Sequence, residues 1–142
     1  MRAYLPDVNI WVALSDPAHA AHELATEWLL GSRGARLLLC PVTEAGFVRI
    51  AASPLLGKKS IADAVRMLRE IAALPNVAHL PVAPTWLKLI EPLTPRLLGH
   101  RQVTDALLLG LAMHNGAILV TLDRAIQALA GEAYAASVLT LA

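Results

Sequence analysis

Short apolar runs alternate with longer segments of helical periodicity along this chain of 142 residues. The apolar runs predict strands at residues 3–5, 37–40, 77–82, 117–120 and 138–141. Segments with apolar residues every three or four positions predict helices at 8–14, 19–30, 42–52, 61–74, 85–98, 103–114 and 123–130. Few of the strands alternate with polar residues, which is typical of a parallel sheet covered by helices on both faces. We therefore expect one α/β domain over residues 1–142, with a mainly parallel sheet of about five strands.

The helix predicted at 103–114 is apolar nearly all round, so it should lie buried at the centre of the domain. Asn115 and Gly116 end it with a left-handed cap. This turn also interrupts the longest uncharged stretch, residues 106–122, which therefore does not provide the roughly 20 apolar residues that a membrane span needs. We expect no membrane partner.

The composition is that of a folded domain, with 56% hydrophobic and 16% charged residues, and it excludes intrinsic disorder. The single cysteine, Cys40, lies in an apolar run that predicts a strand, which indicates a buried thiol. One cysteine makes no internal disulfide, which fits a reducing compartment. We expect a cytoplasmic protein.

The net charge of +1 conceals an uneven distribution. Residues 49–69 carry five cations against Asp63 alone, a local charge of +4. The five cations are Arg49, Lys58, Lys59, Arg66 and Arg69. This segment is either a solvated helix face with a basic loop or a surface that contacts phosphates.

Four of the eleven acidic residues lie at strand ends or helix starts. Asp7 and Asp123 follow the first and fourth predicted strands, and Glu44 lies in the first turn after the second strand. Carboxyl ends of parallel strands share one edge of the sheet, where ligands bind, so these three acids should meet there. Asp105 joins them if the helix at 103–114 begins at that edge.

Helix capping explains any one of these acids, and a structural ion could also hold them. Capping explains Asp105 less well, because an unpaired carboxylate beside an apolar run is costly. Several acids brought together also repel one another, and a divalent cation relieves both problems. All-oxygen ligands predict Mg²⁺ or Mn²⁺, which can activate water for phosphodiester cleavage. Asn9 and Thr121 could orient a metal ligand or water, or serve only as a cap and a strand-end residue.

Four motifs then carry a resemblance that covers nearly the whole chain. They are LPDVNIW at 5–11, TEAGFVR at 43–49, VTDALL at 103–108 and LVTLDR at 119–124. In this order, they resemble the PIN-domain ribonucleases, and within them the VapC-type toxins of bacterial toxin–antitoxin pairs. The resemblance implies a PIN-like three-layer α/β/α sandwich that binds Mg²⁺ or Mn²⁺. By position, it implies the metal ligands Asp7, Glu44, Asp105 and Asp123, with Asn9 and Thr121 as accessory catalytic residues.

The activity that the resemblance implies is metal-dependent cleavage of RNA by activated water. It also implies a homodimer held inactive by a cognate VapB-type antitoxin. In that setting Arg49, Lys58 and Lys59 become candidates for contacts with RNA.

Two other functions stay open from the residues alone. One is a non-catalytic PIN-like binding or adaptor domain, in which the acids cap helices or hold a structural ion. The other is a phosphatase of the haloacid dehalogenase-like class with Asp7 as nucleophile. For that phosphatase, Asn9 stands where a second aspartate is needed, and no lysine lies near a later strand end.

Overall fold

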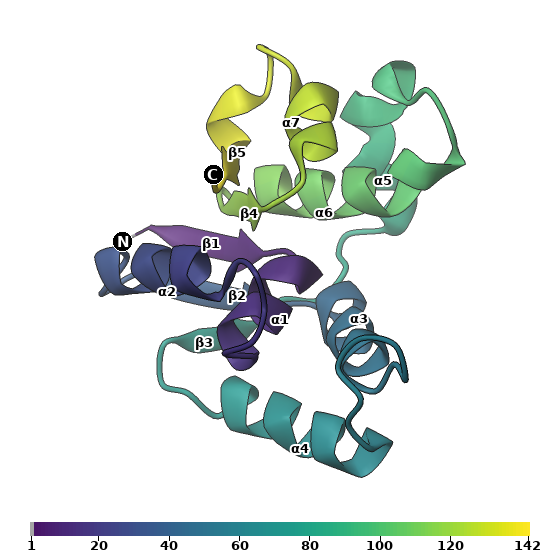
Figure 1. Ribbon diagram of the computed structural model, residues 1–142. Helices are drawn as coiled ribbons and strands as arrows, with labels where there is room; N and C mark the ends of the chain where they lie inside the picture. The colour runs from purple at the N-terminus through teal and green to yellow at the C-terminus, as the bar shows by residue number, and fades with distance from the viewer. Residues whose placement is uncertain (1) are drawn as a thin grey trace.

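Five short strands form one sheet in the computed structural model, which describes residues 2–142 (Figure 1). The strands are β1 (Ala3–Pro6), β2 (Arg36–Leu39), β3 (Val77–His79), β4 (Ile118–Thr121) and β5 (Val138–Thr140). Their order in the sheet is β3-β2-β1-β4-β5, and every neighbouring pair is parallel. The predicted parallel sheet of five strands is confirmed.

The strand order reverses at the junction of β1 and β4. The chain first adds β2 and β3 on one side of β1, and then adds β4 and β5 on the other side. Across this junction Tyr4 pairs with Ile118 and Pro6 with Val120, so the two strands end side by side. In open parallel sheets a crevice forms at such a reversal, beyond the carboxyl ends of the strands.

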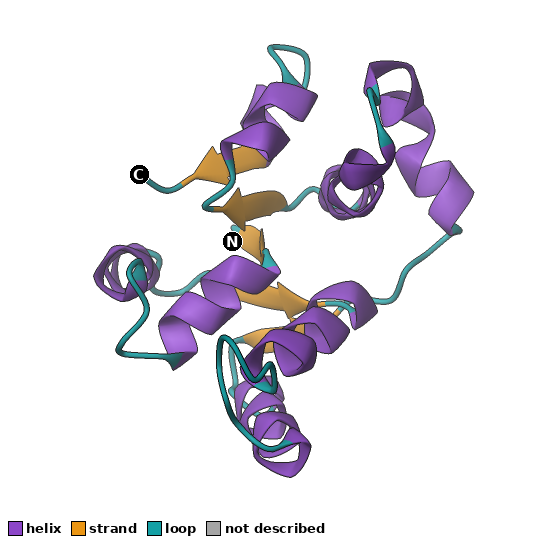
Figure 2. Cartoon of the chain, turned by 45° about the vertical axis from the view of Figure 1, so that its right-hand side comes forward, coloured by secondary structure: helices purple, strands orange, loops and turns teal. Residues whose placement is uncertain are grey.

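Helices cover both faces of the sheet, which makes the three-layer sandwich that was expected (Figure 2). One face packs against α1 (Val8–Ser15), α2 (His22–Gly31), α3 (Pro41–Ala51) and α4 (Ile61–Ala72). The other face packs against α5 (Trp86–Ile90), α6 (Val103–His114) and α7 (Arg124–Ala130). Strand residues alternate between the two layers: Leu5 and Leu119 belong to the core with α6, whereas Tyr4 and Val120 belong to the core with α1 and α2.

The central position predicted for the helix at 103–114 is confirmed. Every residue of α6 from 106 to 112 is buried, and Gly116, with φ of 63°, follows its end. Gly110 lies so close to α5 that an added Cβ would overlap the carbonyl oxygen of Leu89. This backbone contact fixes α6 against α5. Cys40 is also fully buried, as expected.

The prediction of one continuous helix at 85–98 was wrong. Helix α5 ends at Ile90, and a 3₁₀-helix covers Glu91–Arg96. Pro92 and Pro95 lack the backbone N–H that a continuing α-helix requires. Two further 3₁₀-helices cover His100–Gln102 and Ala135–Ser137. Among residues 2–142, no helix is long and apolar enough to cross a membrane.

The substitution Gly110→Ala should lower the free energy of unfolding by about 1–3 kcal/mol, because the new methyl group forces α5 and α6 apart. Urea unfolding monitored by circular dichroism measures the loss. Gly31→Ala is the matched control, because a Cβ at Gly31 meets nothing within 4 Å. Equal stability of the two variants would contradict the close packing of α5 on α6.

Candidate functional site

A buried threonine links the ends of β1 and β4. Thr121 donates a hydrogen bond from Oγ1 to Asp7 Oδ2 (3.0 Å), and the same oxygen accepts one from the backbone N–H of Asp123 (3.0 Å). Asp7 Oδ1 accepts from the N–H of Val8 (2.7 Å), which caps α1. Asp123 Oδ1 accepts from the N–H of Ala125 (2.8 Å), which caps α7. Two predicted acids are therefore held at the strand-order reversal by their helices and by Thr121.

Asp105 reaches the same place from the first turn of α6. Burial raises the pKa of its carboxyl group to about 6, and the negative charges of Asp7 and Asp123 add to the rise. Burial also raises the pKa of Asp7, and the charge of Asp123 contributes, against the opposing effect of hydrogen bonds from Val8 and Thr121. The three aspartates therefore interact electrostatically at the reversal.

Capping accounts for Asp7 and Asp123 in part, but it does not account for Asp105. Helix α6 begins after Gln102, and no side-chain hydrogen bond caps it within the described residues. Partial burial and repulsion thus destabilise the charged form of Asp105, and this residue does not stabilise its helix in return. A partly buried acid beside other acids is the arrangement from which the sequence predicted a bound cation.

Glu44 makes its side-chain contact with a residue outside the three aspartates. It follows β2 in the first turn of α3, and its Oε1 lies 3.1 Å from Nδ1 of His79 at the end of β3. Its charge is not among the causes that raise the pKa of Asp7 or Asp105. His79 was not predicted as a site residue from the sequence, although its position at the carboxyl end of a strand could have indicated it.

The donor set fits a hard divalent cation. Its members offer only carboxylate oxygens, and their mutual repulsion is what a cation of charge +2 would relieve. Asn9 follows Asp7 by two positions in the sequence. Its Oδ1 is buried and has no hydrogen-bond partner among residues 2–142. In the same part of the chain, no group of three His, Cys, Asp or Glu side chains is already gathered closely enough to hold a metal ion.

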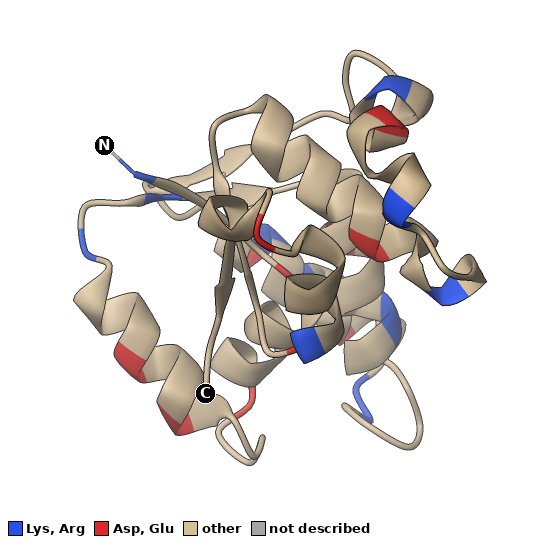
Figure 3. Cartoon of the chain, turned by 90° about the horizontal axis from the view of Figure 1, so that it is seen from above, with Lys and Arg blue, Asp and Glu red and all other residues tan. Residues whose placement is uncertain are grey.

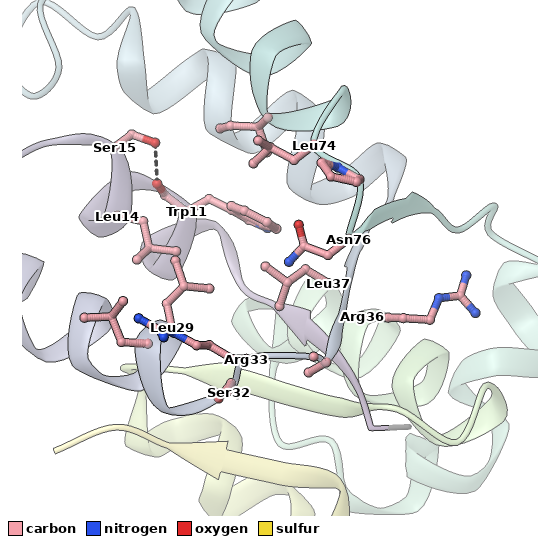
Figure 4. Close-up of a pocket in the computed structure, with 15 residues that line it drawn as sticks. Trp11, Leu14, Ser15, Leu29, Ser32, Arg33, Arg36, Leu37, Leu74 and Asn76 are labelled. Carbon is pink, nitrogen blue, oxygen red and sulfur yellow. Dashed lines mark hydrogen bonds between the residues drawn. The ribbon is translucent and has the colours of Figure 1, made fainter.

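A cavity of about 570 Å³ opens beside the aspartates, and Asp7, Asn9, Thr104 and Arg49 contribute to its lining. Lys58 and Lys59 are exposed on the loop after α3. Figure 3 shows how the basic and acidic residues are distributed over the chain. A larger cavity of about 860 Å³ lies at the opposite edge of the sheet, between the ends of α1, α2 and α4. Figure 4 shows its lining, in which apolar side chains such as Trp11 and Leu37 lie beside Arg33, Arg36 and Asn76. The candidate acids do not line this second cavity.

Comparison with known proteins agrees with this fold and site. The model of the PIN domain family matches residues 4–132, so the chain belongs to the PIN domain family. Within that family, similar curated proteins are VapC ribonucleases of Mycobacterium tuberculosis. Ribonuclease VapC38 is 40% identical over 128 residues, which cover 89% of each chain. Ribonuclease VapC44 is 32% identical over 133 residues, again 89% of each chain.

Solved structures share the fold at low sequence identity. VapBC2 from Rickettsia felis, bound to a DNA fragment from its promoter, aligns with a TM-score of 0.69 and 12% identity over 99% of both chains. VapC20 of Mycobacterium tuberculosis, a toxin that cleaves the sarcin–ricin loop, aligns with a TM-score of 0.62 and 17% identity over 88% of this chain and 93% of that one. FitAcB from Neisseria gonorrhoeae aligns with a TM-score of 0.63 and 18% identity over 89% of this chain and 92% of that one.

The raised pKa of Asp105 predicts a loss of stability as the pH rises. The folded state holds this proton more tightly than the unfolded chain, so the free energy of unfolding should decline between about pH 4 and pH 6 and stay lower above it. Because the group is half exposed to solvent, the expected decline is about 1 kcal/mol. Urea unfolding in EDTA at several pH values measures it.

The variant Asp105→Asn should reduce this decline and be more stable than the wild type at pH 7. The part of the decline that remains belongs to Asp7, whose pKa burial also raises. Asp63→Asn is the control, because Asp63 is exposed on α4 and pairs with Arg66. A decline of the same size in Asp105→Asn would assign the pH dependence to other groups.

Proposed function

We propose that this chain is a metal-dependent endoribonuclease and the toxin of a toxin–antitoxin pair. The observation that carries the proposal is the group of three aspartates at the strand-order reversal, in which Asp105 is partly buried without a hydrogen-bonding role in its helix. The relatives described above are named ribonucleases, which favours RNA cleavage over the phosphatase and the non-catalytic adaptor.

Asp7, Asp105 and Asp123 would hold the cation. A bound Mg²⁺ or Mn²⁺ supplies a Lewis acid that activates water and offsets charge on the phosphate. Thr121 fixes Asp7 through Oδ2, and the N–H of Val8 fixes it through Oδ1, so each oxygen keeps a lone pair for a ligand. Asp123 uses Oδ1 to cap α7 and keeps Oδ2 available.

Glu44 and Asn9 complete the proposed catalytic set. Glu44 lies at the start of α3 and would join the aspartates as a fourth metal ligand when its side chain leaves His79. Asn9 has a buried Oδ1 with no hydrogen-bond partner in the part of the chain that the structure describes, and it would accept a hydrogen bond from water or substrate.

The cations of the loop after α3 would bind the RNA backbone. Arg49 is exposed and lines the cavity next to Asp7, and Lys58 and Lys59 follow on the exposed loop. Their positive charges would attract phosphates to an edge that is otherwise acidic. This arrangement supports a role of the basic segment in substrate binding.

A VapB-type antitoxin, a second copy of this chain and a cytoplasmic location belong to the same proposal. The structures of VapBC2 and FitAcB share this fold, and the relatives carry the VapC name. Copurification of the toxin with the product of an adjacent small gene, followed by light scattering, would test both partners.

Brief induction of the wild type should create new RNA 5′ ends in the cell and slow growth. Asp7→Asn should lower cleavage at these sites by at least 100-fold, because it weakens the cation site that generates the nucleophile. Sequencing of RNA 5′ ends from both strains, with Asp63→Asn as an exposed control, measures the effect. Undiminished cleavage by Asp7→Asn would rule out the mechanism.

Addition of Mn²⁺ at about ten times its dissociation constant should raise the melting temperature of the wild type by about 3 °C. EDTA should reverse the rise, and Asp105→Asn should show less of it, because one ligand and one source of repulsion are lost. Differential scanning fluorimetry measures both proteins. An equal rise in the variant would place the cation away from the three aspartates.

A further inference from the structure

The cavity beside Asp7 has the walls of a binding site for a flat, partly polar group. Its volume is about 570 Å³, and it lies between α1, the loop after α1, α3 and the loop after α3. The apolar part of its lining comes from Val8, Val12, Ile50, Leu55 and Leu56. Leu55 and Leu56 are 88% and 61% exposed, so they contribute little to the core of the fold. Exposed apolar side chains around a cavity mark a binding surface.

The polar side chains that line the cavity include an acceptor and a donor that a ligand could use. Asp16 also lines it, and its Oδ1 accepts the N–H of Ala18 (2.9 Å). Asn9 Oδ1 is a buried acceptor without a hydrogen-bond partner in the described chain. His19 accepts the N–H of Ala21 through Nδ1 (3.0 Å), so in the neutral ring the proton is on Nε2, which becomes a donor. Both residues line the cavity. A ligand that presents a donor next to an acceptor would satisfy both.

Arg49 adds a cation to the same wall. Within residues 2–142 it forms no salt bridge and no side-chain hydrogen bond. The loop that carries Leu55 and Leu56 continues into Lys58 and Lys59, both exposed. Asp7 and Asp16 also line the cavity, so its own lining is not cationic. Arg49 and the exposed Lys58 and Lys59, which follow the wall residue Gly57, attract a phosphate, and the cavity itself is left for a neutral group of a polyanion.

We propose that this cavity binds one unstacked nucleobase of the RNA, directly beside the phosphodiester bond that is cut. The inference rests on the proposed ribonuclease function and gives it a substrate preference. Apolar side chains cover the faces of the base, Asn9 and His19 contact its hydrogen-bonding edge, and Arg49 pairs with a phosphate. The base must be out of a helical stack, so the substrate is single-stranded at this position. Each of the four bases presents a donor next to an acceptor on this edge, uracil through N3–H and O4, so the shape of the cavity decides which base is preferred.

The test uses the double variant Leu55→Ser/Leu56→Ser. Both side chains are exposed, so the variant should fold, and a melting curve checks this. The matched control is Leu30→Ser, because Leu30 is 54% exposed and lines the larger cavity at the opposite edge. The probes are a single-stranded RNA library with random sequence and a fluorescent RNA oligonucleotide.

With Mn²⁺ present, the wild type should cut the library with a base preference at one position beside the cleaved bond. The double variant should lose that preference and cut about tenfold more slowly, because an apolar pocket discriminates by about this factor for each small change of its walls. Leu30→Ser should keep both rate and preference. Cleavage by the double variant with unchanged preference and rate would overturn the nucleobase site while leaving the ribonuclease function intact.

Binding of the fluorescent RNA in EDTA gives a second readout that needs no cleavage. The double variant should bind it about tenfold more weakly than the wild type and Leu30→Ser do. If no RNA is cut with any cation but this difference persists, the ribonuclease function fails and the RNA site stands. If the double variant binds RNA normally and loses only affinity for the antitoxin, the cavity is a protein-binding site and the proposal is overturned.

Discussion

The hydrogen bond from Thr121 to Asp7 joins the two strands at which the order of the sheet reverses, and the candidate site depends on it. It connects residues 114 positions apart, and the same hydroxyl group accepts the N–H of Asp123. Thr121 is fully buried, so this polar contact is shielded from water. One side chain thereby fixes the acid that follows β1 and the turn after β4 relative to each other. Asp105 then approaches them from α6, whose buried surface and close contact with α5 set where its first turn lies.

The three neighbouring acids lower the stability of the fold around them. A half-buried carboxyl group whose pKa rises to about 6 is held beside two other acids, and the fold gains no helix cap from it. The packing around it offsets the cost, since α6 is buried from residue 106 to residue 112 immediately after the acid. Repulsion between buried acids of this kind is typical of sites where a bound ligand relieves it. The raised pKa of Asp105 therefore supports a cation site better than the presence of four acids in the sequence does. Asp7 and Asp123 alone would be explained by their caps.

The layer order and the meeting of Asp7 with Asp123 could be predicted from the sequence, because strand ends in a parallel sheet share an edge. The central position of α6 followed from its apolar composition. Other features depend on tertiary geometry that no local pattern encodes. Glu44 reaches the expected edge, but its partner there is His79, a residue brought alongside only when β3 joins β2. The continuation of α5 as a 3₁₀-helix shows that Pro92 and Pro95 override the apolar periodicity of that segment.

Helix α3 connects the two kinds of charge at the carboxyl edge. Glu44 lies in its first turn and Arg49 in its last, next to the cavity. An RNA phosphate that enters along Arg49 meets three aspartates, whose combined charge repels it as long as they are not neutralised. Under the proposed function, the cation must therefore occupy the site before or together with the RNA. Without a cation, the basic segment could still hold the RNA by its distant phosphates. Under the proposed function, binding of RNA and its cleavage are therefore separable, because the basic residues serve the first and the acidic residues serve the second.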